Sequence, residues 1–250
     1  MIEIRHPLTD DVRSAYDDIY SSTPIVQRDF FYQWLLERLR PERGKRLLDV
    51  SCGIGVLLQF AREAGLQACG VDISRAAVTV ARQRDPLARV AVGNGETLPY
   101  PDDSFDYVTN IGSLEHFEHM PEGAREMARV LRPDGRACIL VPNSFGLLWN
   151  ITTVWHTGDV CDDNQPIQRY GTRQQWQKLL EANGLTVRRV FGYHRALPRT
   201  RRDWLWYLRR PHKLLASLVV IPLIPVNLAS NLVFLCEKGS SPQRAQRHSI

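Results

Sequence analysis

Short apolar runs alternate with stretches of helical periodicity through the middle of the chain. The apolar runs are, in order, RLLDV, ACGVDI, ARVAVGN, FDYVTNI and RACILVP. The amphipathic stretches between them are GVLLQFAREAG, SRAAVTVARQR and GAREMARVL. Within the runs, apolar residues follow one another directly, as is typical of strands buried on both faces of a parallel sheet. The pattern therefore predicts a doubly wound α/β domain.

The flanking regions are less regular. We expect a helix over residues 29–40, where aromatic residues and leucines recur at helical spacing, and a second helix in RQQWQKLLEANG that ends at Asn183 and Gly184. The segments LTVRRVFGY and NLVFLCEK are expected strands, and WHTGDVCDDNQPIQRYGT is an expected loop. The polar end of the chain is an expected disordered tail.

Composition says more about the cellular compartment than about the function. A chain of 250 residues that is 44% hydrophobic can bury one sizeable core, and its net charge of +5 permits an acidic partner without requiring one. The five cysteines form no CxxC pair, and we find no signal peptide at the start. We therefore expect a reduced, cytoplasmic setting without a disulfide framework or structural zinc.

The first apolar run ends on an acid, Asp49, and leads into a turn that contains Gly53 and Gly55. In an open α/β sheet, ligands bind beyond the carboxyl ends of the strands, and glycines there let the backbone approach a ligand closely. The second run ends on Asp72, an acid able to accept hydrogen bonds from both hydroxyls of a ribose. A GxG turn alone would also serve a dinucleotide, but Leu58 replaces the third glycine of that fingerprint. Since Asp49 would also repel a pyrophosphate, these features favour a ligand with a cationic group.

Together with GNGETLPYPDDSFDYVTNIGSLEHF, these residues resemble the class I S-adenosylmethionine-dependent methyltransferases. The resemblance is to the subgroup that includes quinone-biosynthesis and many small-molecule methyltransferases, and it covers about residues 30–145. It implies a Rossmann-like, mostly parallel seven-stranded sheet with helices on both faces and an antiparallel last strand. It also implies an enzyme that transfers a methyl group from S-adenosylmethionine to a small-molecule or lipid-like acceptor, at oxygen or carbon.

Carried over by position, the resemblance assigns cofactor contacts to four segments. In DVSCGIG, Asp49 is expected to face the cofactor's amino group, with the glycines packed beneath the cofactor. In GVDIS, Asp72 is expected on the ribose hydroxyls and Ile73 against the adenine face. GNGETLPY resembles the segment at the adenine edge, and NIGSLEHF the segment that lines the methyl-transfer site. The cofactor-binding residues that we predict are Asp49, Ser51, Cys52, Gly53, Gly55, Asp72, Ile73, Asn94, Gly95, Glu96, Asn110 and Ile111.

Two positions depart from the family pattern. Ser51 stands where a glycine is usual, which narrows the loop. Asn94 stands where an aspartate is usual, so its amide oxygen can accept a hydrogen bond from the adenine amine, but without charge assistance. Gly95 is expected beside the same amine.

Methyl transfer to a hydroxyl or an acidic carbon needs positioning and a base. The candidates are His116 and its neighbour Glu115, because the ordinary pKa of a histidine suits a base near neutral pH. A cap on the following helix and simple packing remain alternative roles for His116. Tyr16, Tyr20 and Trp34 are candidates for a lid over the cofactor or for surface packing.

The predicted organisation follows from these assignments. We expect an N-terminal helical lid (1–45), a cofactor-binding core (46–145), a C-terminal half of the fold with substrate-side insertions (146–238) and the disordered tail (239–250). The largest insertion, 194–228, joins a basic stretch with Trp204 and Trp206 to an apolar run without charges. Pro222 and Pro225 interrupt that run, so we do not expect a transmembrane helix.

Two roles remain open for this insertion. It can roof a greasy acceptor pocket, or residues 195–226 can contact an anionic membrane from the cytoplasmic side, at its inner face. Its apolar run can also support an oligomer. Nucleic-acid methylation is the less favoured alternative, because the basic cluster adjoins an apolar run rather than a polar groove.

The acceptor pocket is expected within residues 146–213. Arg169 and Tyr170 are candidates for the acceptor pocket, and the acids Asp159, Asp162 and Asp163 are not expected to hold a metal. Two further functions stay as alternatives to the enzyme: a membrane-docked binding module without catalysis, and a nicotinamide-dependent oxidoreductase.

Overall fold

The computed structural model describes residues 1–7, 11–22, 25–194 and 197–239. The expected tail, apart from Gly239, lies outside these residues. The strands are β1 (Ile2–Arg5), β2 (Arg46–Val50), β3 (Gln67–Asp72), β4 (Arg89–Val92), β5 (Phe105–Ile111), β6 (Leu131–Pro142), β7 (Ile167–Tyr170), β8 (Leu185–Tyr193) and β9 (Asn231–Lys238). The α-helices are α1 (Val12–Ser22), α2 (Asp29–Leu39), α3 (Val56–Glu63), α4 (Arg75–Arg84), α5 (Met120–Val130), α6 (Thr152–Thr157), α7 (Arg173–Ala182), α8 (Arg201–Leu208) and α9 (Pro211–Leu215).

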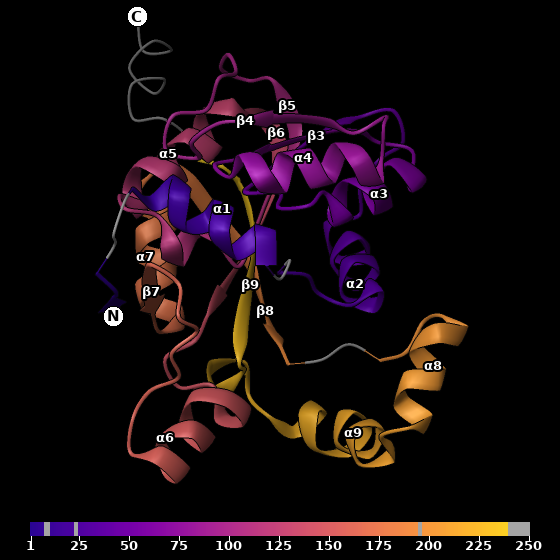
Figure 1. Ribbon diagram of the computed structural model, residues 1–250, viewed down its shortest axis with the longest axis vertical. Coiled ribbons are helices and arrows are strands. Elements are labelled where there is room, and N and C mark those ends of the chain that lie inside the picture. The colour runs from indigo at the N-terminus through magenta and orange to yellow at the C-terminus, as the bar shows by residue number, and fades with distance from the viewer. Residues whose placement is uncertain (8–10, 23–24, 195–196, 240–250) are drawn as a thin grey trace, which may run out of the picture.

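Seven strands form one sheet in the order β4-β3-β2-β5-β6-β9-β8 (Figure 1). The strands from β4 to β6 are parallel, and β9 runs antiparallel to both of its neighbours. The expected fold class is therefore confirmed, including the antiparallel last strand. Sheet order reverses between β2 and β5, which is the point where such folds place their ligands.

Both faces of the sheet are covered, and β2 shows why apolar residues follow one another directly within a strand. Successive side chains of a strand point to opposite faces. Accordingly, Leu47 lies in the core formed with α2, α3 and α4, while Leu48 lies in the core formed with α5 and α7. Since neither face meets solvent, no polar alternation is left in this strand.

The first 45 residues do not form a separate lid. α2 begins at Asp29, as the helical spacing predicted, but it is largely buried against the sheet. Trp34 packs against Phe191 and Tyr193 of β8, with ring centroids 6.3 and 5.1 Å away, so it does not cover a ligand. Among the described residues of this region, α1, the residues just after it and Tyr32 of α2 reach the cavity described below.

The expected loop from residue 155 to 172 is wrong in part. Residues Trp155 to Thr157 belong to helix α6, and β7 pairs antiparallel with β1 in a second, two-stranded sheet. Arg169 of β7 is buried, donates to Glu3 of β1 at 2.6 Å, and donates to the backbone carbonyls of Glu115, Phe117 and Glu118. This one side chain therefore connects the N-terminal strand to the segment that follows β5.

Between β8 and β9 the chain makes a long excursion instead of a hairpin. Besides α8 and α9 it contains a π-helical turn, η3 (Ala216–Val220), and two short 3₁₀ turns, η4 (Ile221–Leu223) and η5 (Val226–Leu228). Within the part of the chain that the structure describes, no helix has the length and apolar character needed to span a bilayer.

Two tryptophans allow a test of the packing. Trp176 of α7 is fully buried and donates its indole N–H to the Pro142 carbonyl at 2.9 Å. Trp176→Ala should lower the free energy of unfolding by about 3 to 5 kcal/mol, because it leaves a cavity and an unpaired carbonyl. Trp155→Ala is the matched control: this tryptophan is 84% exposed, so its loss should change stability by less than about 0.5 kcal/mol. Urea unfolding measures both, and equal effects would contradict the described core.

Candidate active site

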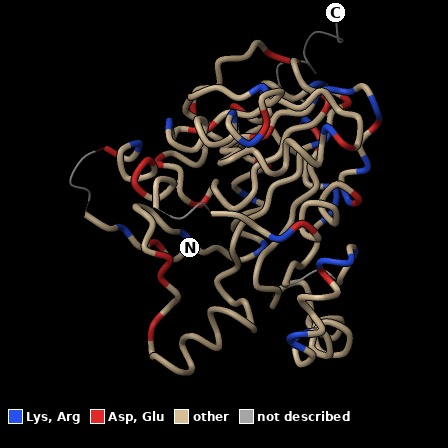
Figure 2. Tube along the Cα trace, turned by 45° about the vertical axis from the view of Figure 1, so that its right-hand side comes forward, with Lys and Arg blue, Asp and Glu red and all other residues tan. Residues whose placement is uncertain are grey.

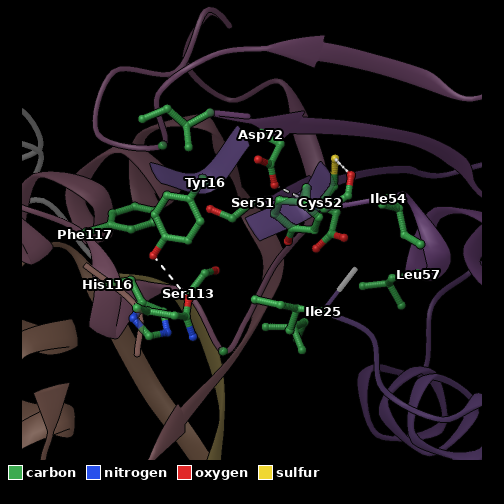
Figure 3. Close-up of a pocket in the computed structure, with 18 of the residues that line it drawn as sticks. Tyr16, Ile25, Ser51, Cys52, Ile54, Leu57, Asp72, Ser113, His116 and Phe117 are labelled. Carbon is green, nitrogen blue, oxygen red and sulfur yellow. Dashed lines mark hydrogen bonds between the residues drawn. The ribbon is translucent and has the colours of Figure 1, made fainter. Parts of the chain in front are cut away.

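A cavity of about 450 Å³ opens at the carboxyl ends of the parallel strands (Figure 3). Most of its wall comes from the ends of β2, β3 and β5, from the segments that follow β2 to β5, from α1 and from the chain between α1 and α2. Tyr32 of α2, Leu140 of β6 and Gln165 before β7 complete it. Eleven of the fourteen residues predicted for the site line it. They are Asp49, Ser51, Cys52, Gly53, Asp72, Ile73, Asn94, Gly95, Glu96, Ile111 and His116.

Asp49 lies near the end of the central strand β2 and is buried. Thr109 Oγ1 of the neighbouring strand β5 donates to its Oδ1 at 2.7 Å. Burial nevertheless raises the pKa of Asp49 to about 7, because no Lys or Arg of the described residues forms an ion pair with it. A buried acid without a cation, at the wall of a cavity, fits a ligand that brings a positive charge.

The glycine turn after β2 needs left-handed backbone at three positions: φ is +61° at Ser51, +53° at Gly53 and +76° at Gly55. Glycine adopts this conformation freely, whereas a serine there costs about 1 kcal/mol. The departure from the family pattern at Ser51 therefore places strained backbone in the cavity wall. Tyr20 of α1 covers the turn: its hydroxyl lies 2.8 Å from where a Cβ of Gly53 would be.

Asp72, at the end of β3, also holds this turn. Its Oδ2 accepts from the Gly53 N–H at 2.7 Å and its Oδ1 from the Ser74 N–H at 2.9 Å. Burial outweighs these hydrogen bonds and raises the pKa of Asp72 to about 6. Each carboxylate oxygen keeps a further lone pair, so the side chain can still accept from two ligand hydroxyls.

In the segment after β4, fewer lone pairs and less space are free for a ligand than expected. Asn94 Oδ1 already accepts from the Glu96 N–H at 2.9 Å, which leaves one lone pair for a ligand. A Cβ on Gly95 would lie 2.5 Å from the ring of Phe117, so only glycine fits at this place.

Three predicted residues do not line the cavity. Gly55 is the N-cap of α3 and approaches Ala81 of α4, where an added Cβ would be 3.3 Å away. Asn110 is buried and structural: it donates to the Val50 carbonyl at 3.2 Å and accepts from the Leu114 N–H at 2.9 Å. Glu115 lies behind the cavity wall, and burial raises its pKa to about 8.

His116 does line the cavity, in the 3₁₀ turn η1 (Leu114–His116). Its Nδ1 is within hydrogen-bonding distance of the Ile167 carbonyl, which can only accept, so Nδ1 carries the proton and Nε2 keeps its lone pair. Burial lowers the pKa of His116 and keeps the ring neutral at pH 7. Nε2 lies 3.8 Å from Glu115 Oε1 and 3.9 Å from Asp163 Oδ2. Neither contact is short enough to occupy this nitrogen.

Two buried polar atoms beside His116 have no hydrogen-bond partner among the described residues. They are the hydroxyl of Ser113, which lines the cavity, and Oε2 of Glu115. Tyr16 of α1 lies over the same corner and donates to Gln165 Oε1 at 3.3 Å (Figure 3). This corner therefore offers unused polar groups to a second ligand group.

Sequence reasoning missed part of the wall. Tyr32 and Gln165 line the cavity without having been predicted, and no local motif marks them. Ser113 and Phe117 line it too; they were not named individually, but they lie in NIGSLEHF, the segment expected to line the methyl-transfer site. The proposed acceptor-pocket role of Arg169 and Tyr170 is wrong, since both are buried in contacts with backbone carbonyls.

The charge of the wall is one-sided. Four carboxylic acids line the cavity, Asp49, Asp72, Glu96 and Glu118. Among the described residues that line it there is no Lys or Arg. Such a wall repels a pyrophosphate and attracts a cation.

Comparison with known proteins agrees with this geometry. Residues 27–190 match the model of the methyltransferase domain family. Methyltransferase GfsG of Streptomyces halstedii is 36% identical over 145 residues, which are 54% of this chain and 52% of that protein. Demethylmenaquinone methyltransferase of Corynebacterium efficiens is 32% identical over 136 residues, 52% of this chain and 58% of that protein. The chain thus spans about half the length of these relatives.

A solved structure is similar in fold. It is phosphoethanolamine N-methyltransferase 2 of Haemonchus contortus, in complex with phosphomonomethylethanolamine and S-adenosylhomocysteine. Its TM-score is 0.60 at 20% sequence identity, over 91% of this chain and 57% of that one. Since the family model covers well over half of the chain, the chain belongs to the methyltransferase domain family.

Proposed function

We propose that this protein is an S-adenosylmethionine-dependent methyltransferase that acts on an apolar small-molecule or lipid-like acceptor, at oxygen or carbon. The observation that carries the proposal is the cavity wall, which has four acids and, among the described residues, no Lys or Arg, and which is built around the uncompensated Asp49. When bound, S-adenosylmethionine supplies a methyl group activated by a sulfonium, and this cation and its ammonium suit an acidic wall.

The residues that would hold the cofactor fit its parts. Asp49 would meet the ammonium and Asp72 the two ribose hydroxyls, because both carboxylates are buried at strand ends with lone pairs to spare. Ile73 would meet the adenine face, and Asn94 the adenine edge through its remaining lone pair. The close packing of Gly53 against Tyr20 would keep that side of the cofactor free of water.

On the acceptor side, His116 would act as the general base through Nε2. Its Nδ1–H is held by the Ile167 carbonyl, so the ring is oriented and in the required tautomer. The hydroxyl of Ser113 and the side chains of Tyr16 and Gln165 would orient the acceptor's polar end. Apolar residues at the opening, Ile25 and Val26, favour an acceptor with a hydrophobic body. The similarity to a demethylmenaquinone methyltransferase makes a quinone the first acceptor to try.

The two alternative functions, a nicotinamide-dependent oxidoreductase and a binding module without catalysis, explain fewer of these observations. A dinucleotide would bring its pyrophosphate against the acidic wall. A binding module without catalysis is favoured by the strained Ser51 and the uncharged Asn94, but it gives no role to the oriented, unprotonated Nε2 of His116.

Cofactor binding tests the proposal directly. Asp72→Ala should weaken binding of S-adenosylmethionine and S-adenosylhomocysteine by at least roughly 100-fold, since two hydrogen bonds to a charged group are lost. The affinity of Asp72→Asn, which keeps one acceptor oxygen, should lie between those of the wild type and Asp72→Ala. The control Asp134→Ala, at an exposed position, should bind as the wild type does. Titration calorimetry measures the affinities, and circular dichroism checks folding. Undiminished binding by a folded Asp72→Ala variant would refute this assignment, as would tighter binding of NAD.

The pH dependence of binding tests Asp49. Without ligand its pKa is about 7, and an ammonium beside it would favour the carboxylate and lower that value. Binding therefore releases a proton below pH 7, so affinity for S-adenosylmethionine should rise with pH up to about 7 and level off above it. Asp49→Asn should bind more weakly and without this dependence. A wild-type affinity that stays constant from about pH 5.5 to 8.5 would exclude the role.

Turnover tests His116. With reduced demethylmenaquinone as the first acceptor, His116→Ala should lower kcat by roughly 100- to 10,000-fold. Because the ring does not touch the cofactor in this assignment, affinity for S-adenosylmethionine should stay the same. Nitrogen NMR of histidine-labelled protein at pH 7 should show a neutral His116 ring with the proton on Nδ1, identified by its loss in the variant. A protonated ring, or an unchanged kcat, would speak against a general base here.

A further inference from the structure

Two segments far apart in the sequence expose apolar side chains at the same end of the molecule. We call them the α6 lobe, residues 144–158, and the α8–α9 lobe, residues 200–228. Both extend from the lower end of the structure in Figure 1, and the rotated view in Figure 2 shows them there again. The α6 lobe contains no Asp, Glu, Lys or Arg.

Apart from α8, which adds Tyr207 to the core, the helices of these lobes bury little. Neither α6 nor α9 has a buried residue, and the same holds for η4 and η5. The exposed apolar side chains of the α6 lobe are Phe145, Leu148, Trp149, Val154 and Trp155. Those of the α8–α9 lobe are Trp204, Leu205, Leu208, Leu215, Leu218, Val219, Val220 and Leu223, of which Leu223 is 78% exposed. Apolar patches of this extent on a folded chain mark an interaction surface.

Helix α8 shows what kind of surface this is. Arg201, Trp204, Leu205, Leu208 and the C-cap Arg209 are exposed and follow the spacing i, i+3, i+4, i+7, i+8, so they share one face. Arg202 is exposed as well, to one side of this face. The opposite face is fixed to the body, since Asp203 and Tyr207 are buried. An outward apolar face with an aromatic residue and a cation at each end is the arrangement of a helix that lies in a membrane interface.

More cations border the apolar part of this lobe. The guanidinium of Arg210 and the ammonium of Lys213 lie over the ring of Trp206, at 4.9 and 5.4 Å from its centroid. Neither Arg201 nor Arg209 forms an ion pair with a described residue. These charges are available to anionic head groups, while the apolar side chains can enter the region beneath them.

The two lobes are joined at their base. A Cβ on Gly146, at the start of the α6 lobe, would lie 2.8 Å from Cα of Ser230, just beyond the α8–α9 lobe. Asn143 donates to the carbonyls of Asn227 and Ala229, both at 2.8 Å. The lobes therefore leave the carboxyl ends of β6 and β8 together, at the edge of the sheet where the cavity opens.

Three acids follow the α6 lobe: Asp159 is exposed directly after it, and the other two are directed elsewhere. Asp162 is directed to the body, where it contacts His6 at 3.0 Å. Asp163 lies 3.9 Å from His116 at the cavity. Against Asp159, the α8–α9 lobe carries five cations, Arg201, Arg202, Arg209, Arg210 and Lys213.

We propose that the α6 lobe and the α8–α9 lobe together form a docking surface for an anionic lipid bilayer. Both lobes enter the interface without spanning it, and the cavity opening faces the membrane between them. Docking does not depend on the proposed methyl transfer. If that function holds, the surface deepens it, because a lipid-like acceptor would reach the cavity from the bilayer.

Vesicle flotation of the full chain tests this surface. The protein should float with vesicles of phosphatidylcholine and phosphatidylglycerol, much less with phosphatidylcholine alone, and less as salt is raised. Trp155→Ser combined with Trp204→Ser, one from each lobe, should weaken binding at least about tenfold. Arg201→Glu with Arg209→Glu should do the same for the anionic vesicles. Brominated lipids should quench the wild-type tryptophan fluorescence, a second measure of insertion.

Matched controls lie on another part of the surface. Leu87, which is 75% exposed before β4, and the exposed Arg84 of α4 serve for this purpose. Leu87→Ser and Arg84→Glu should float like the wild type. A folded wild type that floats with neither vesicle, or controls that lose binding equally, would overturn the proposal. The proposal would also be overturned if the wild type bound no vesicles and light scattering showed a dimer that the lobe substitutions convert to monomer. Calorimetry with S-adenosylmethionine on the same variants should be unchanged, which separates this result from failure of the proposed function.

Discussion

The buried carboxylate of Asp49 is the constraint on which the site depends. It lies at the end of the central strand, covered on both faces, and Thr109 supplies its only side-chain hydrogen bond among the described residues. Its folded pKa of about 7 lies above the ordinary 3.8, so proton binding favours the folded chain. The stability cost of the carboxylate is therefore absent below about pH 4, grows through the range between, and is complete above about pH 7. At neutral pH the folded chain therefore tolerates this destabilisation and retains negative charge at Asp49, which a cationic ligand can neutralise.

The rest of the site is built around this acid from both ends of the chain. α1 is fixed over the cavity by Asp17, whose Oδ1 accepts from the Ser74 hydroxyl at 2.6 Å and the Ala76 N–H at 2.9 Å. Asp17 is thus a second cap on α4, where the helix dipole favours a negative charge. From the other direction, Arg169 holds the segment after β5 against the β1–β7 pair. The cavity is closed by parts that a core of strands β2 to β6 would not contain.

This construction explains how far the sequence could predict the site. Asp49, Asp72 and the glycine turn were predictable because strand ends and turns are local features, and the parallel sheet brings them to one edge. Gln165 was not, since it meets Tyr16 only through a tertiary contact across more than a hundred residues. The strand pair β1–β7 was missed for the same reason: each strand has only four residues and gains its stability from Arg169. The sequence also predicted Asn110 as a ligand contact, although its side chain forms its hydrogen bonds with backbone groups.

The net charge of the chain does not show how its charges are distributed over the molecule. The chain carries +5 overall, yet its cavity is lined by acids and lacks Lys and Arg among the described residues. Excess positive charge instead borders the apolar α8–α9 lobe. Coulomb interactions between exposed groups are screened within about 10 Å, so the outer cations can attract an anionic surface without weakening the attraction of the inner wall for a cation. The proposed cationic cofactor and the proposed membrane surface would therefore meet opposite charges on one protein, because burial separates the two fields.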